Sequence, residues 1–179
     1  MPAYTRGMLP HADAAKVRLL VLDADGTLTD GGICVDGHGV ETKRFSVRDG
    51  FAIRAWMRTG RQLAVITGRG ETSLRHRLAD LGVQHLIAAS GPKGAVIERL
   101  LGELSVPASE AAAMGDDLPD LPLLRRVGYP MAVGDAVPEV KAVAAWTSVA
   151  HGGYGAVREA VEHLLKKAGA WQSVVESFA

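Results

Sequence analysis

Short apolar runs alternate with segments of helical periodicity along most of the chain, and this alternation restricts the possible folds more than any other feature. The apolar runs have the length of buried strands and occupy residues 17–22, 63–67, 83–89, 111–114, 131–133 and 146–149. Between and after them, apolar residues recur at helical spacing, as around Trp56, Leu78, Ile97 and Val161. Strands that alternate with helices form a parallel sheet covered on both faces, so the sequence predicts a doubly wound α/β fold.

One segment interrupts this alternation. Residues 31–47 carry two short apolar stretches on either side of the turn-forming sequence Asp36-Gly37-His38-Gly39, which predicts a small β-hairpin flap. No other insertion is long enough for a cap domain. A chain of 179 residues fits one domain. We therefore expect a flexible N-terminus over residues 1–15, a single domain over 16–168 and a C-terminal tail over 169–179.

Composition excludes several classes of partner. Twenty basic and twenty acidic residues cancel, so no overall field attracts nucleic acid or a membrane surface. No segment approaches the roughly 18 apolar residues that a membrane span needs. The single cysteine, Cys34, excludes an intramolecular disulfide and a thiolate zinc site. It suits a reducing compartment, and we expect a cytoplasmic protein.

Acidic residues gather where the predicted strands end. In LLVLDADGTLTD, Asp23 and Asp25 follow the first strand directly. Alone, two such aspartates could equally be solvated loop residues. Parallel strands, however, end at one edge of the sheet, where further polar residues are expected to converge: Thr67, Lys93, Asp116, Asp117 and Asp120. Because crowded carboxylates repel one another, a hard divalent cation with oxygen ligands is expected there, and Mg²⁺ is the usual ion beside a phosphate.

These motifs resemble those of a known superfamily. In order, Asp23-Ala24-Asp25-Gly26-Thr27, Thr67, Lys93 and Gly115-Asp116-Asp117 resemble the four motifs of the haloacid dehalogenase-like phosphohydrolases. The flap and the stretches FSVRDG, ITGR and GGYGAVRE further resemble the 3-deoxy-D-manno-octulosonate 8-phosphate phosphatases. The resemblance runs from about residue 17 to 167. It implies a capless, Rossmann-like phosphatase that releases phosphate from this phosphorylated sugar acid in lipopolysaccharide precursor biosynthesis.

The resemblance also implies roles for the motif residues. Asp23 would attack phosphorus and form an aspartyl phosphate, and Asp25 would act as general acid and then general base. Thr67 and Lys93 would bind the non-bridging phosphate oxygens.

The implied metal site holds Mg²⁺ through three positions. Asp23 and Asp116 would supply carboxylates, and Asp25 its main-chain carbonyl. Asp117 or Asp120 is expected to brace the metal's water ligands or Lys93.

Substrate recognition is expected to involve residues around the start of the first helix. Guanidinium groups suit the carboxylate of a sugar acid, and Arg48 and Arg69 lie beside the flap and the Thr67 loop. Arg54 and Arg77 could equally be solvated helix residues. The full predicted set is Asp25, Ser46, Val47, Arg48, Asp49, Gly50, Arg54, Arg69, Arg77 and Lys93.

Several alternatives stay open from sequence. A nine-carbon sialic-acid-like 9-phosphate would suit the same flap and arginines. A phosphoacceptor receiver domain also combines acids, Thr and Lys on a doubly wound sheet, although its acceptor aspartate comes from a later strand. A catalytically idle module would normally have lost some of the motif residues. The resemblance further implies a homotetramer in which flaps meet and the glycine-rich segment 151–155 shapes a shared entrance, whereas those glycines could simply form a turn.

Overall fold

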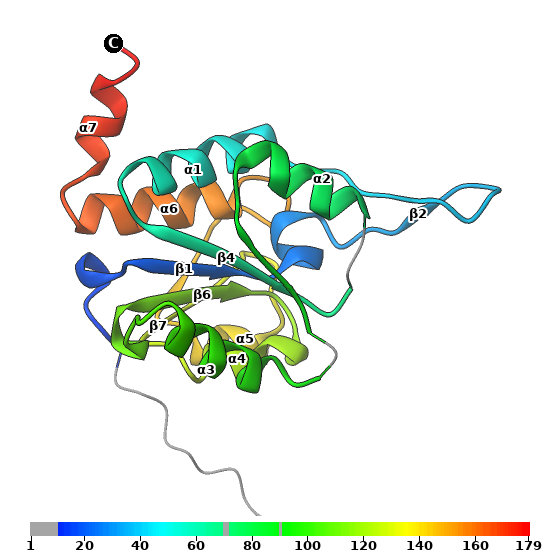
Figure 1. Cartoon of the computed structure of the whole chain (residues 1–179), viewed down its shortest axis with the longest axis horizontal. Helices are drawn as coiled ribbons and strands as arrows, with labels where there is room; N and C mark the ends of the chain where they lie inside the picture. The colour runs from blue at the N-terminus through cyan, green and yellow to red at the C-terminus, as the bar shows by residue number, and fades with distance from the viewer. Residues whose placement is uncertain (1–10, 70–71, 90) are drawn as a thin grey trace, which may run out of the picture.

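Six parallel strands form the central sheet of the molecule (Figure 1). The computed structural model describes residues 11–69, 72–89 and 91–179. The strand order is β5-β4-β1-β6-β7-β8. The bounds are β1 Leu19–Leu22, β4 Gln62–Thr67, β5 His85–Ala88, β6 Ala111–Gly115, β7 Tyr129–Ala132 and β8 Trp146–Thr147. The order reverses at β1, where ligands bind in open α/β sheets.

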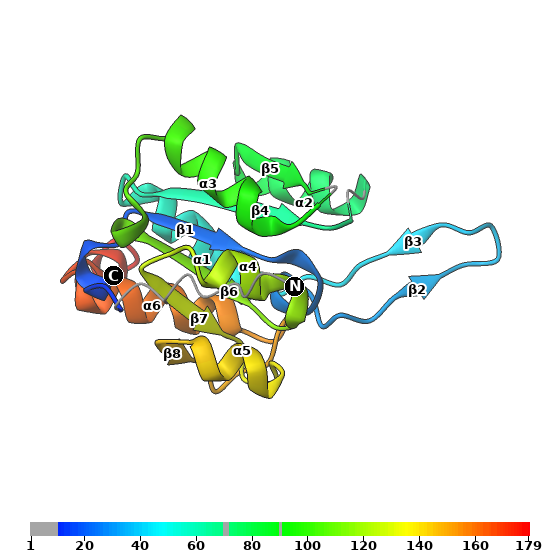
Figure 2. The same cartoon turned by 90° about the horizontal axis from the view of Figure 1, so that it is seen from below.

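Helices cover both faces of this sheet, which confirms the predicted doubly wound fold (Figures 1 and 2). One face carries α1 (Val47–Arg58), α2 (Thr72–Leu81) and α6 (Ala156–Lys167). The other carries α3 (Lys93–Glu103), α4 (Leu121–Leu124) and α5 (Pro138–Val143). Four further turns of helix are η1 Ala14–Lys16, η2 Ala24–Leu28, η3 Ala108–Glu110 and η4 Leu118–Asp120. In the part of the chain that the structure describes, no helix is long and apolar enough to cross a bilayer.

The core explains why β1 is apolar along its whole length. All four of its residues are fully buried, because β4 and β6 pair with its edges and helices cover both of its faces. Trp56 of α1 is also fully buried and packs against this core. Its Nε1 donates a hydrogen bond to the Gln62 carbonyl at 2.7 Å. The central strand is therefore held rigidly where its carboxyl end enters the loop that begins at Asp23.

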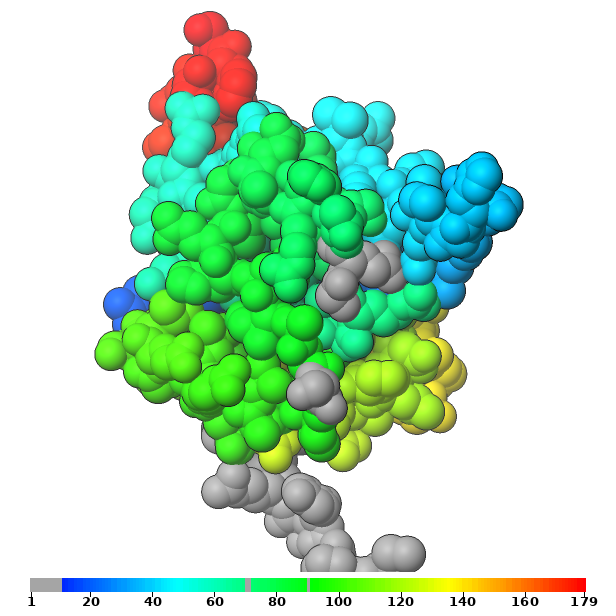
Figure 3. All heavy atoms as spheres, turned by 45° about the vertical axis from the view of Figure 1, so that its right-hand side comes forward, coloured from blue at the N-terminus to red at the C-terminus, as the bar shows by residue number. Residues whose placement is uncertain are grey.

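The predicted flap is a two-stranded hairpin that projects from the body (Figure 2). It consists of β2 (Cys34–Val35) and β3 (Glu41–Thr42), which pair antiparallel. The Asp36 carboxylate accepts hydrogen bonds from the His38 and Val40 amides and so fixes the turn. In the space-filling view the hairpin forms a light-blue lobe well away from the C-terminal segment in red (Figure 3).

The C-terminal segment is ordered as a helix, α7 (Trp171–Glu176), at the end of the molecule opposite the flap (Figure 1). Val174 is buried, and the Phe178 ring lies 5.3 Å from the Phe51 ring of α1. This segment therefore packs on its own chain. Of the predicted flexible N-terminus, residues 1–10 lie outside the described part, while Asp13 caps η1 through the Ala15 amide.

Candidate active site

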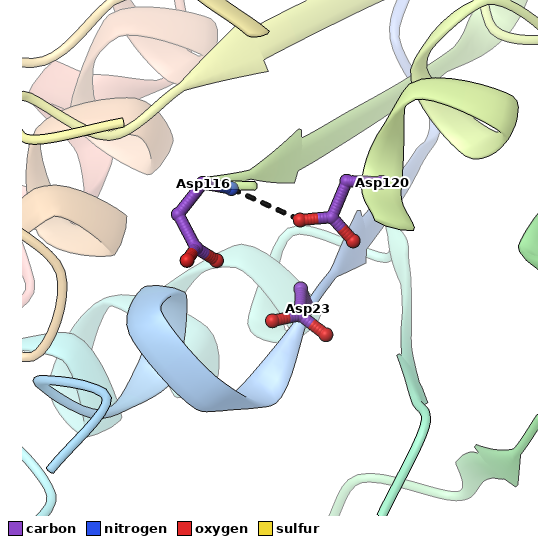
Figure 4. Close-up of side chains that lie close together, drawn as sticks. All are labelled: Asp23, Asp116 and Asp120. Carbon is purple, nitrogen blue, oxygen red and sulfur yellow. Dashed lines mark hydrogen bonds between the residues drawn. The ribbon is translucent and has the colours of Figure 1, made fainter. Parts of the chain in front are cut away.

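Three carboxylates meet at the carboxyl end of the sheet. Asp23 follows β1, Asp116 follows β6, and Asp120 ends η4. One oxygen from each lies within 4.8 Å of the others, and Figure 4 shows the three carboxylates gathered together. The Asp116 amide donates a hydrogen bond to Asp120 Oδ2 at 3.0 Å, which fixes the turn after β6. Segments almost 100 residues apart thus supply one acidic cluster.

The η2 turn after β1 fits tightly under this cluster. Gly26 has φ +88°, and a Cβ at this position would overlap the Asp116 carboxylate. Glycine is therefore required both by the backbone conformation and by the space available. The neighbouring Thr27 hydroxyl donates a hydrogen bond to Asp116 Oδ1 at 3.2 Å. The Asp-x-Asp-Gly-Thr sequence thus holds the second acidic segment in place.

Lys93 supplies the positive charge of the cluster from the first turn of α3. Its Nζ lies 2.5 Å from Asp23 Oδ1 and 2.6 Å from Asp120 Oδ1. Burial opposes the charge of the ammonium, but the two carboxylates outweigh this effect, and the pKa of Lys93 lies above its ordinary value. Asp120 therefore contacts Lys93, one of the expected roles for this acid. Asp117 is exposed and caps η4 through the Leu118 amide.

One lysine does not neutralise three carboxylates. Burial, followed by the charges of Asp23 and Asp120, raises the pKa of Asp116 to about 8. Burial, followed by the charge of Asp120, raises the pKa of Asp23 to about 6, although Lys93 acts in the opposite direction. Carboxylate oxygens that crowd at this spacing suit a hard divalent cation, which would stabilise the charged forms. The donor set therefore fits Mg²⁺, with Asp23 and Asp116 among the ligands.

These raised pKa values predict how stability depends on pH and on metal. Because the folded pKa of Asp116 lies above the ordinary value of 3.8, the metal-free folded state loses stability as pH rises toward about 8. Mg²⁺ binds the deprotonated carboxylates of the folded state, so it should stabilise more at pH 8 than at pH 6. Thermal unfolding with EDTA and with Mg²⁺ at both pH values measures this. In Asp116→Asn, the stabilisation by Mg²⁺ should differ less between pH 8 and pH 6. An equal rise in Tm on adding Mg²⁺ to the wild type at both pH values would contradict the assignment of Asp116 as a metal ligand.

The predicted acid/base residue lies beside the cluster and not within it. The Asp25 side chain is partly exposed and contacts the Lys43 ammonium, which comes from the base of the flap. Thr67 is buried at the end of β4, and its hydroxyl donates to the Arg69 carbonyl and accepts from the Arg69 amide, both at 3.1 Å. Both residues thus lie at the carboxyl ends of neighbouring central strands.

The FSVRDG segment is divided between the surface and the protein interior. Val47 and Arg48 are exposed on the first turn of α1, and the Ser46 hydroxyl caps this helix through the Asp49 amide. The buried Asp49 carboxylate instead accepts hydrogen bonds from the Gly155 amide, at 3.2 Å, and the Arg158 amide, at 2.7 Å. The Asp49 carboxylate therefore caps the start of α6.

Two of the four predicted arginines are occupied elsewhere. Arg54 donates to the Asp80 carbonyl at 2.6 Å, and Arg77 contacts the Asp80 carboxylate at 3.1 Å. The guanidinium group of Arg77 also covers Gly50, where a Cβ would overlap it. These contacts join α1 to α2, and the assignment of Arg54 and Arg77 to substrate binding stays a prediction. Arg69, in contrast, reaches the flap, where it contacts Glu41 Oε2 at 2.7 Å.

Two features of the site were not found by sequence reasoning. Lys43 was not singled out as a neighbour of Asp25, although it is one of the cations at the base of the predicted flap. The glycine-rich segment approaches the η2 loop, because a Cβ at Gly152 would overlap the Gly26 carbonyl, and the Gly153 amide donates to the Thr27 carbonyl at 3.0 Å. These glycines therefore serve a close approach within one chain, between the last loop and the first.

Comparisons with known proteins agree with this geometry. A family model described as haloacid dehalogenase-like hydrolase matches residues 85–160. The 3-deoxy-D-manno-octulosonate 8-phosphate phosphatase of Escherichia coli K12 is 40% identical over 154 residues, which cover 86% of this chain and 82% of that protein. A similar fold is seen in the crystal structure of the 3-deoxy-D-manno-octulosonate 8-phosphate phosphatase from Moraxella catarrhalis, which holds magnesium, phosphate and KDO. Its TM-score is 0.90 at 34% identity, and the match covers 93% of this chain and 96% of that one. A cobalt-bound structure of the deoxy-D-mannose-octulosonate 8-phosphate phosphatase from Haemophilus influenzae has a TM-score of 0.85 at 35% identity. The match covers 89% of this chain and 93% of that one.

By sequence and by fold, this chain belongs to the 3-deoxy-D-manno-octulosonate 8-phosphate phosphatase family of the haloacid dehalogenase-like hydrolases.

Proposed function

We propose that the protein is a Mg²⁺-dependent phosphatase that hydrolyses 3-deoxy-D-manno-octulosonate 8-phosphate to the free sugar acid and phosphate. The observation that carries this proposal is the position of Asp23 at the end of the central strand, where Lys93, Asp116 and Asp120 converge on it. Asp25 lies two residues further along the same loop. This arrangement provides a nucleophile, a separate proton donor and countercharges for a phosphate.

The reaction proceeds in two displacements. In the first, an Asp23 carboxylate oxygen forms a bond to phosphorus while the bond to the sugar oxygen breaks, and Asp25 gives that oxygen a proton. In the second, water attacks the aspartyl phosphate, Asp25 takes the proton, and phosphate leaves as Asp23 is regenerated. Two carboxyl groups are needed because one stays covalently occupied between the two steps.

The surrounding groups stabilise the phosphate charge. Lys93 is held in place by Asp120 and offers its ammonium to the non-bridging oxygens, and Thr67 offers a hydroxyl at the end of β4. Mg²⁺, held by Asp23, Asp116 and the Asp25 carbonyl, would offset the repulsion between the nucleophile and the phosphate. A site without a cap domain fits the absence of any long insertion in this sequence.

The choice of sugar acid rests on the relatives and on the cations near the flap. Arg48 and Arg69 are exposed on the segments that border the site and suit a carboxylate. The family relationship supports a role in supplying the sugar acid for lipopolysaccharide precursors, in the cytoplasm.

A steady-state comparison tests the substrate. Phosphate release is measured with the eight-carbon sugar-acid 8-phosphate, a nine-carbon sialic-acid-like 9-phosphate and p-nitrophenyl phosphate as a generic substrate. We expect the highest kcat/KM for the eight-carbon acid. A clear preference for the nine-carbon compound would favour the alternative substrate, and absence of phosphate release from all three would contradict phosphatase function.

We further propose that the protein assembles as a homotetramer through its flaps. An isolated two-stranded hairpin is marginally stable in water. The hairpin nevertheless carries three large apolar side chains that are more than half exposed, Ile33, Val35 and Val40. Contact between flaps of neighbouring subunits would bury them and would screen a site that has no cap domain.

Sedimentation velocity measures this assembly at micromolar concentration. We expect a tetramer for the wild type and smaller species for a double variant that carries both Val35→Asp and Val40→Asp, because charged side chains oppose burial in an interface. Lys166→Met, an exposed change on α6, serves as a control. A wild-type monomer that is fully active and selective would rule out a shared site.

A further inference from the structure

The base of the flap contains a buried lysine in a segment that is otherwise exposed. Residues 31–40 are exposed throughout, whereas the Lys43 side chain is only 2% exposed. Lysine normally keeps its ammonium in water. Burying this ammonium therefore requires charged partners, and the site supplies them.

Those partners connect the flap to the D-x-D loop. Lys43 Nζ contacts Asp25 Oδ1 and lies 3.6 Å from Glu41 Oε1. The other Glu41 oxygen contacts Arg69 Nη2 at 2.7 Å. The backbone amide and carbonyl of Arg69 are in turn hydrogen-bonded to the Thr67 hydroxyl. A continuous series of charged contacts thus runs from Asp25, through the flap, to the loop after β4.

This arrangement gives each aspartate of the D-x-D pair its own lysine. Asp23 is paired with Lys93, which belongs to the helical framework, whereas Asp25 is paired with Lys43, which belongs to the flap. Lys43 contacts the Oδ1 oxygen of Asp25. The carboxyl group is held in one orientation by a residue that does not itself bond to the reacting atoms.

We infer that Lys43 is a positioning residue that orients the Asp25 carboxyl group for proton transfer, and that Glu41 and Arg69 hold Lys43 in place. The inference rests on the proposed function, in which Asp25 protonates the departing sugar oxygen. Lys43 keeps its own proton throughout the reaction, and only the Asp25 carboxyl group gives and takes one. A flap that is displaced would carry Lys43 away and leave Asp25 misoriented.

The leaving group of the substrate separates this role from simple binding. An alkyl phosphate needs protonation of its leaving oxygen, whereas p-nitrophenolate leaves readily without it. Lys43→Met should therefore lower kcat for the sugar-acid phosphate about 10- to 100-fold, part of the 10²–10⁴-fold that general acid catalysis supplies. The pre-steady-state burst of p-nitrophenolate and the KM values should change little. Lys43→Arg should recover part of the loss, and Lys166→Met, whose ammonium contacts Glu162 on α6, should match the wild type.

A double-mutant cycle with Asp25→Asn decides whether Lys43 acts through Asp25. We expect Lys43→Met to have no further effect on kcat in the Asp25→Asn background. Three outcomes would each overturn the inference. The losses of kcat could be additive in the double variant, the p-nitrophenolate burst of Lys43→Met could fall as much as its kcat for the sugar-acid phosphate, or Lys43→Met could turn over at the wild-type rate. A wild type that cleaves p-nitrophenyl phosphate but not the sugar-acid phosphate would instead contradict the proposed substrate, and the cycle is then measured with an alkyl phosphate that the wild type accepts.

Discussion

Asp23→Asn is expected to lower kcat by at least about 10⁴-fold while the protein stays folded, because removal of a covalent nucleophile costs this much or more. The substitution keeps the size of the side chain but removes the charge that attacks phosphorus. It also relieves the repulsion with Asp120 that helps to raise the pKa of Asp23, so no loss of fold is expected from crowding. Phosphate release and circular dichroism of the same sample measure the two properties.

The control for this variant is Asp30→Asn. Asp30 belongs to the same loop but is exposed and paired with Arg44, so its replacement should leave kcat near the wild-type value. Rapid acid quenching should trap phosphorylated protein from the wild type and none from Asp23→Asn. Near wild-type turnover by a folded Asp23→Asn protein would remove Asp23 from the reaction and with it the aspartyl-phosphate mechanism.

Lys93→Met is expected to reduce both activity and stability. Methionine fills the space of the lysine stem, but Asp23 and Asp120 lose the ammonium that contacts both of them. Breaking a buried ion pair by removal of one partner costs about 3–5 kcal/mol of unfolding free energy, which corresponds to a decrease of roughly 6–20 °C in the Tm of a chain of this size. Activity should fall because the phosphate oxygens lose their fixed cation.

Thermal unfolding in EDTA measures the effect without compensation by metal. The matched control is Lys141→Met, since the Lys141 ammonium donates to the Gly134 carbonyl and its residue is exposed. Addition of Mg²⁺ should restore part of the stability of Lys93→Met, because the cation offsets some of the carboxylate repulsion. A Tm equal to that of the wild type in EDTA would show that the Lys93 contacts contribute nothing to stability.

The fold and the location of the site could be predicted from sequence because both depend on local patterns and on one topological rule. The unbroken apolar run of β1 requires burial on both faces, and alternation with helices makes the sheet parallel. Parallel strands end together, so Asp23, Thr67 and Asp116 had to meet near one edge. The short helices α4 and α5 were missed, since four to six residues carry too little periodicity to be recognised.

The partners of individual side chains depend on packing between segments far apart in the sequence, which no local pattern encodes. Spacing alone could not show that Asp49 caps α6, that Arg54 and Arg77 bind Asp80, or that the tail after Gly169 packs on α1. The same holds for Lys43. A lysine in a hairpin is ordinarily solvated, and its burial against Asp25 arises only when the base of the flap packs beside the D-x-D loop. The residue types that the chemistry requires are thus readable along the chain, whereas the orientation of each one is a property of the assembled fold.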